Sequence, residues 1–432
     1  MRPASSPFRR VGGPVVGPIG AWQHSAVEAT SLSGVRAHAA WTVLDQIVSS
    51  GSNAILPVVA ISVLAADAAG RLSVLLSLVF FALGVCRSLV GETFLLSRRP
   101  ASGEDLLNQE MLGTALVLGL VAGIPVAIAA LALLHARWAA LAVTVGFGAI
   151  VLQDAVRYAF FSALRARRAV LSDLTWLLAF LAIVLAMRSR LTPVGLMLGW
   201  IVAGSVAGGV GVWQLRSWPA VREAPRVLRR QARLGAKIGA EYVAVSGLPQ
   251  VLIAIVGLSG EISAAGPYRL ATTLLTPAGV VVAGVVTALQ PVCVRCADQP
   301  LRLRGYFLRA AGIGSAAVAL CTLVVVASPA AWGQKLFGGA IVDARRLCVP
   351  LGVAGMAQST SAAANLVLRT RGRVIDAVRV RFGFGLACLV AAVPVAQRWG
   401  GSGVAWLYAA GSVASAAALL LSPALRFRVS AR

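Results

Sequence analysis

The stretch WTVLDQIVSSGSNAILPVVAISVL, residues Trp41 to Leu64, is 24 residues long and carries a single charge, at Asp45. A helix of about 20 mostly apolar residues spans the hydrocarbon core of a bilayer, so this stretch predicts a transmembrane helix. Four of its polar residues share one helical face by their spacing: Asp45, Ser49, Ser52 and Asn53. Such a face is costly against lipid. It is expected to face either a cavity or, through interhelical hydrogen bonds, a neighbouring helix.

Eleven further apolar stretches follow, and only 12% of the 432 residues are charged, against 58% hydrophobic. A soluble protein of this composition would expose large apolar patches, whereas a bilayer accepts them. We therefore predict an all-α polytopic membrane protein of about 12 transmembrane helices. The predicted spans are Trp41–Leu64, Leu72–Leu96, Met111–Leu134, Trp138–Phe161, Val170–Met187, Pro193–Leu215, Ile238–Leu258, Tyr268–Val292, Phe307–Ala327, Leu347–Leu368, Val380–Ala396 and Ser402–Leu421.

Basic residues indicate the orientation of these helices. The chain has 39 Lys and Arg against 15 Asp and Glu, a formal charge of +24. They lie in short runs between apolar stretches, which argues against nucleic-acid binding. With the N-terminus inside, the N-terminal tail, the alternate loops and the C-terminal tail hold 26 of them and the opposite side holds 8. Because cytoplasmic loops collect Lys and Arg, both termini are expected in the cytoplasm.

The longest loop between the predicted spans, residues 216–237, is rich in arginine and divides the helices into two sets of six. It is either an amphipathic connector held on the anionic cytoplasmic leaflet or a plain loop that sets the topology. The first helix of each set carries an acid and a later proline, a faint repeat typical of transporters with two lobes around a central cavity. The expected segments are a flexible cytoplasmic tail at 1–40, six-helix lobes at 41–215 and 238–422, the basic connector between them, and a cytoplasmic tail at 423–432.

Ionisable residues inside the predicted spans are the candidate functional residues, because a charge within a membrane is costly. Asp45, Glu92 and Glu241 are candidates for proton or ion coupling. Together with Asn53 they are also candidate substrate contacts. Arg87 and Glu92 lie five positions apart in the second span, so each is expected to pair elsewhere.

Two arginines, Arg87 and Arg269, lie in the second helix of each predicted lobe. Guanidinium groups bind phosphate oxygens in a bidentate manner, so the two could clamp a diphosphate. Arg269 could instead extend to the outer interface. Asp154 and Arg157 are three residues apart and are expected to form a structural ion pair within one helix. A role in transport is the alternative interpretation of this pair.

No pattern predicts a metal or cofactor site. Cys293 and Cys296 form the one CxxC pair, but no second pair or nearby histidine completes a zinc site. The sequence contains no Walker A motif, so ATP hydrolysis by that route is excluded. We expect no metal and no cofactor.

Several short stretches with polar residues form a recognisable pattern along the chain. They are Trp41–Asn53, Cys86–Glu92, Gln153–Tyr158, Asp173 with Trp176, Tyr268–Arg269 and Leu274–Pro277. In these stretches the chain resembles the polysaccharide-biosynthesis flippases of actinobacteria, within the multidrug/oligosaccharidyl-lipid/polysaccharide (MOP) exporter group. The resemblance implies two six-helix lobes around a V-shaped cavity, alternating access, and movement of an undecaprenyl-diphosphate-linked sugar to the outer leaflet. Because Arg87 and Arg269 lie in the corresponding helices, the resemblance makes them the candidate contacts of the diphosphate.

The predicted function is therefore a flippase or exporter of a lipid-linked oligosaccharide in the cytoplasmic membrane. A cation-coupled multidrug antiporter of the same fold is the main alternative, since a membrane carboxylate such as Asp45 can bind a proton or sodium ion. A membrane-embedded glycosyltransferase or polymer ligase fits less well, because the short outer loops lack residues for acid–base chemistry. The protein is thus expected not to be an enzyme. Its expected partners are the lipid-linked sugar, anionic lipids and glycosyltransferases of polysaccharide assembly, with no nucleic acid.

Overall fold

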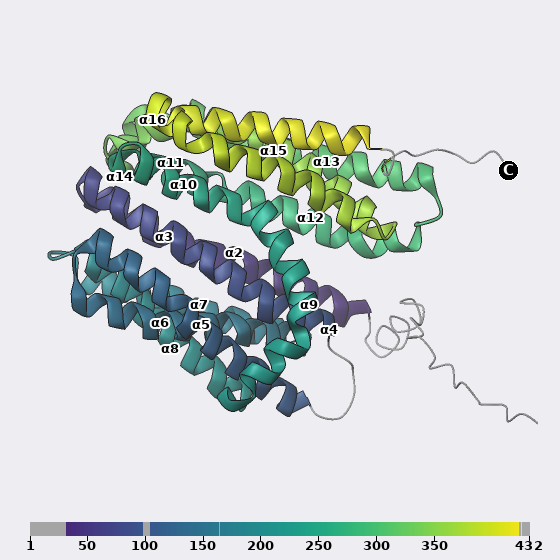
Figure 1. Cartoon of the computed structure of the whole chain (residues 1–432), viewed down its shortest axis with the longest axis horizontal. Helices are drawn as coiled ribbons and strands as arrows, with labels where there is room; N and C mark the ends of the chain where they lie inside the picture. Colours follow the sequence, from purple (N-terminus) through teal and green to yellow (C-terminus); the bar gives the residue numbers. More distant parts are fainter. Residues whose placement is uncertain (1–31, 98–103, 164, 423–424, 426–432) are drawn as a thin grey trace, which may run out of the picture.

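The computed structural model describes residues 32–97, 104–163, 165–422 and 425, and this part of the chain is all-α. Nine of its helices are long and apolar enough to cross a membrane. Figure 1 shows the helices arranged in two bundles, with α2 (Leu32–Val63) and α3 (Ala66–Arg87) lying between the remaining helices of the two halves. The predicted all-α, two-lobed architecture is therefore confirmed.

The N-terminal lobe contains the first six spans. Its core is built around large side chains that are almost completely buried, among them Phe147, Phe160 and Trp200. The indole Nε1 of Trp176 donates a hydrogen bond of 3.1 Å to the carbonyl oxygen of Trp200, which joins two helices of this core. After α2 and α3 the helices are α5 (Glu104–Leu134), α6 (Arg137–Ser162), α7 (Ala166–Ala186) and α8 (Pro193–Leu215).

The second span changes its helical form near its cytoplasmic end. The α-helix α3 continues into a π-helical turn, η1 (Ser88–Glu92), and then into α4 (Thr93–Ser97). Single π-turns within α-helices are frequent at functional sites. Here the turn begins directly after Arg87 and ends at Glu92.

The predicted connector at 216–237 is mostly helical and runs directly into the seventh span. After η2 (Val221–Glu223), helix α9 (Ala224–Tyr242) continues through a second π-turn, η3 (Val243–Gly247), into α10 (Leu248–Ser259). Figure 1 shows α9 crossing from one bundle to the other. Arg230 on α9 lies 2.6 Å from Glu110 on α5, so α9 is attached to the first lobe.

The C-terminal lobe contains the remaining spans and one short extra helix. The last two spans form a single long element, α16, which turns at Gly400, where φ is 59° and ψ is −155°. A glycine adopts this positive φ without the cost that a β-carbon would bring. The elements after α10 are η4 (Ile262–Ala264), α11 (Ala265–Leu274), α12 (Thr276–Arg295), α13 (Pro300–Ala327), α14 (Ala330–Phe337), α15 (Ala340–Thr370) and α16 (Val374–Leu421).

Two predicted boundaries differ from the structure. The expected tail at 1–40 is too long, because α2 already begins at Leu32; residues 1–31 and most of the tail at 423–432 lie outside the described residues. The single helix expected for the eighth span is wrong, since it divides into α11 and α12 at Leu275. Pro277 explains the break, because its ring leaves no backbone N–H for a bond to the preceding turn.

The two lobes touch at the ends of α2 and α3 that lie outside under the N-in topology. Ile61, Ala69 and Val74 of the first lobe are buried in the core cluster formed by α10, α11, α15 and α16. This contact closes the outer end of the lobe interface. The cavities described below lie between the lobes and within the second lobe.

Candidate functional site

A cavity of about 350 Å³ lies between the two lobes. Its lining includes three of the predicted substrate contacts, Asn53, Arg87 and Arg269, brought together from α2, α3 and α11. Both lining charges are arginines, and no described carboxylate lines the cavity. The cavity therefore favours an anion over a cation. The other lining residues are Ser50, Ala54, Pro57, Phe80, Leu83, Gly84, Tyr242, Ser246, Gln250, Thr272, Thr273 and Thr276.

Arg269 is a buried cation without a carboxylate partner among the described residues. Its side chain donates to Gln250 Oε1 at 2.9 Å and to Ser77 Oγ at 3.3 Å, and its guanidinium carbon lies 5.1 Å from the centroid of the Phe80 ring. The Nε atom is buried and makes no hydrogen bond. A buried, uncompensated charge costs free energy, so an anion in the cavity would be stabilised here. With only 4% of Arg269 exposed, the structure does not place it at the outer interface.

Arg87 lies at the same cavity but is already neutralised. Its Nε and Nη2 atoms donate to the two carboxylate oxygens of Asp154 at 2.9 and 2.8 Å, a bidentate arrangement that fixes both side chains. The Arg87 side chain keeps 31% of its surface exposed. Arg87 can therefore contact a ligand in the cavity while its guanidinium group stays paired with Asp154.

The network extends from Asp154 into the first lobe through Arg157. The Arg157 guanidinium lies 3.2 Å from Asp154, 2.6 Å from Asp45 and 3.0 Å from Asp173. Gln153 Nε2 donates to the second oxygen of Asp173 at 2.6 Å. Asp45 is thus placed in this buried network and does not line the cavity.

The network joins four helices, α2, α3, α6 and α7, and all of its charged members except Arg87 are buried. It contains three carboxylates and two guanidinium groups, a formal excess of one negative charge. One further positive charge, a proton or a small cation, would balance it.

A second cavity of about 280 Å³ contains the two predicted glutamates, Glu92 and Glu241, together with Arg369 and Arg381. Glu241 accepts a hydrogen bond from Arg369 on α15 and another, of 3.3 Å, from Asn365 Nδ2. Since Glu241 belongs to α9, this ion pair attaches the connector to the second lobe. We call this space the vestibule, because it adjoins the inter-lobe cavity, with which it shares the lining residues Tyr242 and Ser246.

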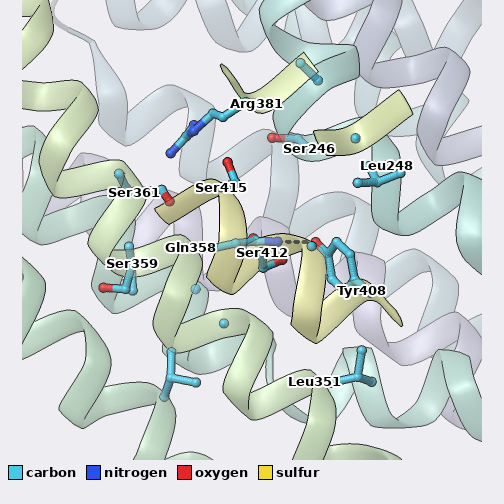
Figure 2. Close-up of a pocket in the computed structure, with 18 of the residues that line it drawn as sticks. Ser246, Leu248, Leu351, Gln358, Ser359, Ser361, Arg381, Tyr408, Ser412 and Ser415 are labelled. Carbon is cyan, nitrogen blue, oxygen red and sulfur yellow. Dashed lines mark hydrogen bonds between the residues drawn. The ribbon is translucent and has the colours of Figure 1, made fainter. Parts of the chain in front are cut away.

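A third cavity, of about 490 Å³, lies within the second lobe between α10, α12, α13, α15 and α16. Figure 2 shows its polar side chains, with Gln358 donating a hydrogen bond to the Tyr408 hydroxyl. Ser246, on the π-turn η3, lines all three cavities. The three spaces therefore meet at one residue.

The sequence alone did not indicate Ser246 or Arg381 as site residues. Arg381 is an arginine within an apolar stretch, a pattern that could have marked it. Nothing in the sequence marks Ser246, because it lines the cavities through its position on the π-turn η3 and not through its residue type. Asp173 was noticed only through the family resemblance, and its contact with Arg157 was not predicted.

The sequence matches no known family profile and no curated protein, whereas solved structures match over most of the chain. An inward-facing multidrug resistance MATE family transporter of the MOP superfamily has a TM-score of 0.70 at 13% identity, covering 88% of this chain and 96% of that one. This chain therefore shares the fold of that transporter.

Two other MOP structures have the same fold. The lipid II flippase MurJ, in an inward closed conformation, gives a TM-score of 0.63 at 8% identity, covering 87% of this chain and 86% of that chain. A MOP transporter from Pyrococcus furiosus, described by the reverse polarity of its binding pocket, gives 0.57 at 14% identity, with coverages of 90% and 94%. Proteins with this fold include both multidrug transporters and a lipid flippase. The fold alone therefore does not identify the substrate, and the cavity has to be considered.

Proposed function

We propose that this protein is an alternating-access flippase or exporter that moves a polyprenyl-diphosphate-linked oligosaccharide or polysaccharide precursor across the cytoplasmic membrane. The observation that carries the proposal is Arg269, a buried cation that lines the inter-lobe cavity and has no carboxylate partner among the described residues. Transport, and not catalysis, accounts for such a group in a MOP fold.

The chemistry of a diphosphate explains why a cation of this kind is useful. A diphosphate loses its hydration when it leaves water for a protein cavity, and that loss is costly unless fixed charges and donors replace the water. Arg269 offers an unused Nε–H, and the Arg87 side chain is partly exposed to the same cavity. Thr272 and Thr273 also line the cavity, but their hydroxyl groups already donate to the Arg269 carbonyl oxygen at 2.8 Å, so the two arginines supply the free donors.

A flipping assay in proteoliposomes tests this proposal. Replacing Arg269 with Ala should reduce the flipping of an undecaprenyl-diphosphate-linked sugar at least tenfold, and Lys should restore only part of it, because an ammonium lacks the bidentate fork. Arg87→Ala should also reduce flipping. Arg309→Ala is the matched control, since Arg309 is an exposed arginine in another span and lines none of the three cavities. Flipping at the wild-type rate by an Arg87→Ala, Arg269→Ala double variant would eliminate the diphosphate clamp.

A cation-coupled multidrug antiporter is the second candidate, and the charge of the first-lobe network favours it. The excess negative charge among Asp45, Asp154 and Asp173 suits a coupling proton or cation. Glu92 and Glu241 in the vestibule are further coupling candidates. Efflux of a cationic dye such as ethidium, driven by a pH or sodium gradient and indifferent to Arg269→Ala, would support the antiporter over the flippase.

Anionic lipids are proposed partners of the connector. Helix α9 buries Ala224, Val227 and Gly235 and turns its basic residues outward. Each basic residue near an anionic leaflet contributes about 1 kcal/mol. Glycosyltransferases of polysaccharide assembly are also proposed partners, because they would make the proposed lipid-linked substrate. The exposed basic residues of the connector are Arg222 on η2 and, on α9, Arg226, Arg229, Arg230, Arg233 and Lys237, of which Arg230 also pairs with Glu110.

A further inference from the structure

The largest of the three cavities is lined by hydroxyl and amide groups inside an otherwise apolar lobe. The polar groups are contributed by η3, α15 and α16, and the walls between them are aliphatic or aromatic. Its volume of about 490 Å³ lies within the range of small-molecule sites, roughly 300–1,000 Å³. The polar lining residues are Ser246, Gln358, Ser359, Ser361, Tyr408, Ser412 and Ser415, besides Arg381.

Most of these hydroxyls are not bonded to the protein. Serines in the helices of this chain commonly donate to a carbonyl oxygen of the preceding turn, as Ser52 and Ser205 do. Within the described residues, Ser361, Ser412 and Ser415 are buried but make no hydrogen bond. Ser359 differs, because its Oγ is fully enclosed against Gly314 of α13 and cannot reach a ligand in the cavity. Only the other three serines are therefore free to bond a ligand. Polar groups left unsatisfied in a buried site are costly. These side chains are therefore suited to a ligand that supplies many donors and acceptors.

The charge of the lining excludes cations and favours neutral or anionic ligands. No described carboxylate lines the cavity, and Arg381 is its one charged residue. Arg381 forms no ion pair within the described part of the chain and also lines the vestibule. Figure 2 shows its guanidinium pointing into the same space as Ser361 and Ser415. A cationic drug would be repelled at this position.

The cavity also borders the proposed diphosphate site. Ser246 lines both, on the π-turn that interrupts the seventh span. One elongated molecule could therefore place one end near Arg269 and the other end beside Gln358.

We propose that this second-lobe cavity binds a sugar unit of the lipid-linked substrate while the diphosphate lies at Arg269. The inference rests on the proposed function and adds to it a separate site for the glycan. Sugars carry hydroxyls that both donate and accept, which matches the free serines and the Gln358–Tyr408 pair. The rings of Phe384 and Tyr408 supply apolar faces for the sugar ring. A polyprenyl tail fits less well, because it would leave the three free serines and Arg381 without partners.

Binding measurements on the full chain in nanodiscs test the proposal. The probes are radiolabelled undecaprenyl diphosphate and the same lipid linked to N-acetylglucosamine, glucose or galactose. At least one sugar should tighten binding to the wild type by about tenfold, which corresponds to two net hydrogen bonds. A Ser412→Val, Ser415→Val variant should lose this gain while binding the sugar-free lipid as the wild type does. Ser402→Val is the matched control, an exposed serine on the same helix outside the cavity.

The outcomes separate the sugar site from the diphosphate site. An undiminished gain in the double Val variant would overturn the sugar site, as would the lack of any gain in the wild type. Tighter binding of the sugar-free lipid by that variant would also overturn it, since a more apolar cavity would favour a lipid tail. Arg269→Ala should weaken all four lipids equally, and indifference of all four to Arg269→Ala contradicts the proposed function instead.

A second measurement does not depend on the diphosphate. In a cysteine-free chain carrying Ser412→Cys, methyl glycosides of the same three sugars should slow modification of the thiol by a maleimide at least twofold. A cysteine at Ser402 should react at the same rate with or without the glycosides. Equal rates at both positions would count against the sugar site even if lipid binding fails for other reasons.

Discussion

Gly70 on α3 and Ile262 at the start of η4 bring the backbones of the two lobes into contact, so closely that a β-carbon at position 70 would lie 2.0 Å from the Ile262 carbonyl oxygen. Because the obstacle is backbone and not a flexible side chain, a larger residue at 70 cannot be accommodated without separating the lobes here. Gly70 therefore permits the outer end of the interface to close.

Replacing Gly70 with Leu should shift the protein toward a state with its outer ends apart. Spin labels are placed at Arg137 and Arg398, in outer connections of the first and second lobes. Double electron–electron resonance should report a longer distance between the two labels in the variant than in the wild type. Gly312→Ala is the control, because open space surrounds a β-carbon at 312. An unchanged distance distribution would show that another contact holds the outer end closed.

The packing of Tyr242 against Gly84 gives a second prediction. A β-carbon on Gly84 would lie 1.9 Å from Cζ of Tyr242, whose hydroxyl donates to the Phe80 carbonyl oxygen at 3.1 Å. Gly84→Ala should therefore destabilise the protein by about 1–3 kcal/mol, as overpacking does. Adding Tyr242→Ala should remove much of this cost, since the new methyl group then has room. Thermal unfolding of both single variants and the double variant measures the coupling, and simple additivity would contradict the contact.

The first-lobe network predicts opposite effects for two of its members. Arg157→Met removes the cation shared by three aspartates and should destabilise the protein by about 3–5 kcal/mol, because it leaves buried carboxylates unpaired. Asp173→Asn removes the excess negative charge while an amide can still bond to Gln153, so its stability should equal or exceed that of the wild type. Unfolding temperatures in detergent compare the two variants. A larger loss for Asp173→Asn than for Arg157→Met would refute this account of the network.

The topology can be checked by labelling single cysteines in a cysteine-free chain. A membrane-impermeant maleimide added to intact cells should modify cysteines placed at Arg137 and Arg398. It should not reach cysteines placed at Arg229 and Ala236, on the exposed face of α9, until the membrane is permeabilised. Modification of the α9 positions in intact cells would show that the chain has the opposite orientation in the membrane.

The spans could be predicted from the sequence because each depends on a local property, an apolar run long enough to cross a bilayer. The sixth span, Pro193–Leu215, has the predicted bounds. Arg87, Arg269 and Asn53 were also recognised locally, as polar residues in apolar stretches, and the structure places them at one cavity.

The partners of the charged residues could not be predicted, because they are distant in the sequence. Arg157 reaches Asp45 across 112 positions, and nothing near either residue indicates the other. Asp45 therefore looked like a cavity residue although it is buried in an ion network. The π-turn that places Ser246 at the meeting point of three cavities depends on tertiary packing and leaves no pattern in the sequence.

The ion network of the first lobe has a consequence for how the protein is made. Its five charged members, Asp45, Arg87, Asp154, Arg157 and Asp173, all belong to the first five spans. Since N-terminal domains fold first during synthesis, these charges can neutralise one another while the ribosome is still translating the second half. Arg269 has no such opportunity, because the described partners of its side chain are hydroxyl, amide and aromatic groups, and two of them, Ser77 and Phe80, belong to the first lobe. Insertion of the short helix α11 should therefore be the slow step of biogenesis, completed only when a finished first lobe is there to receive it.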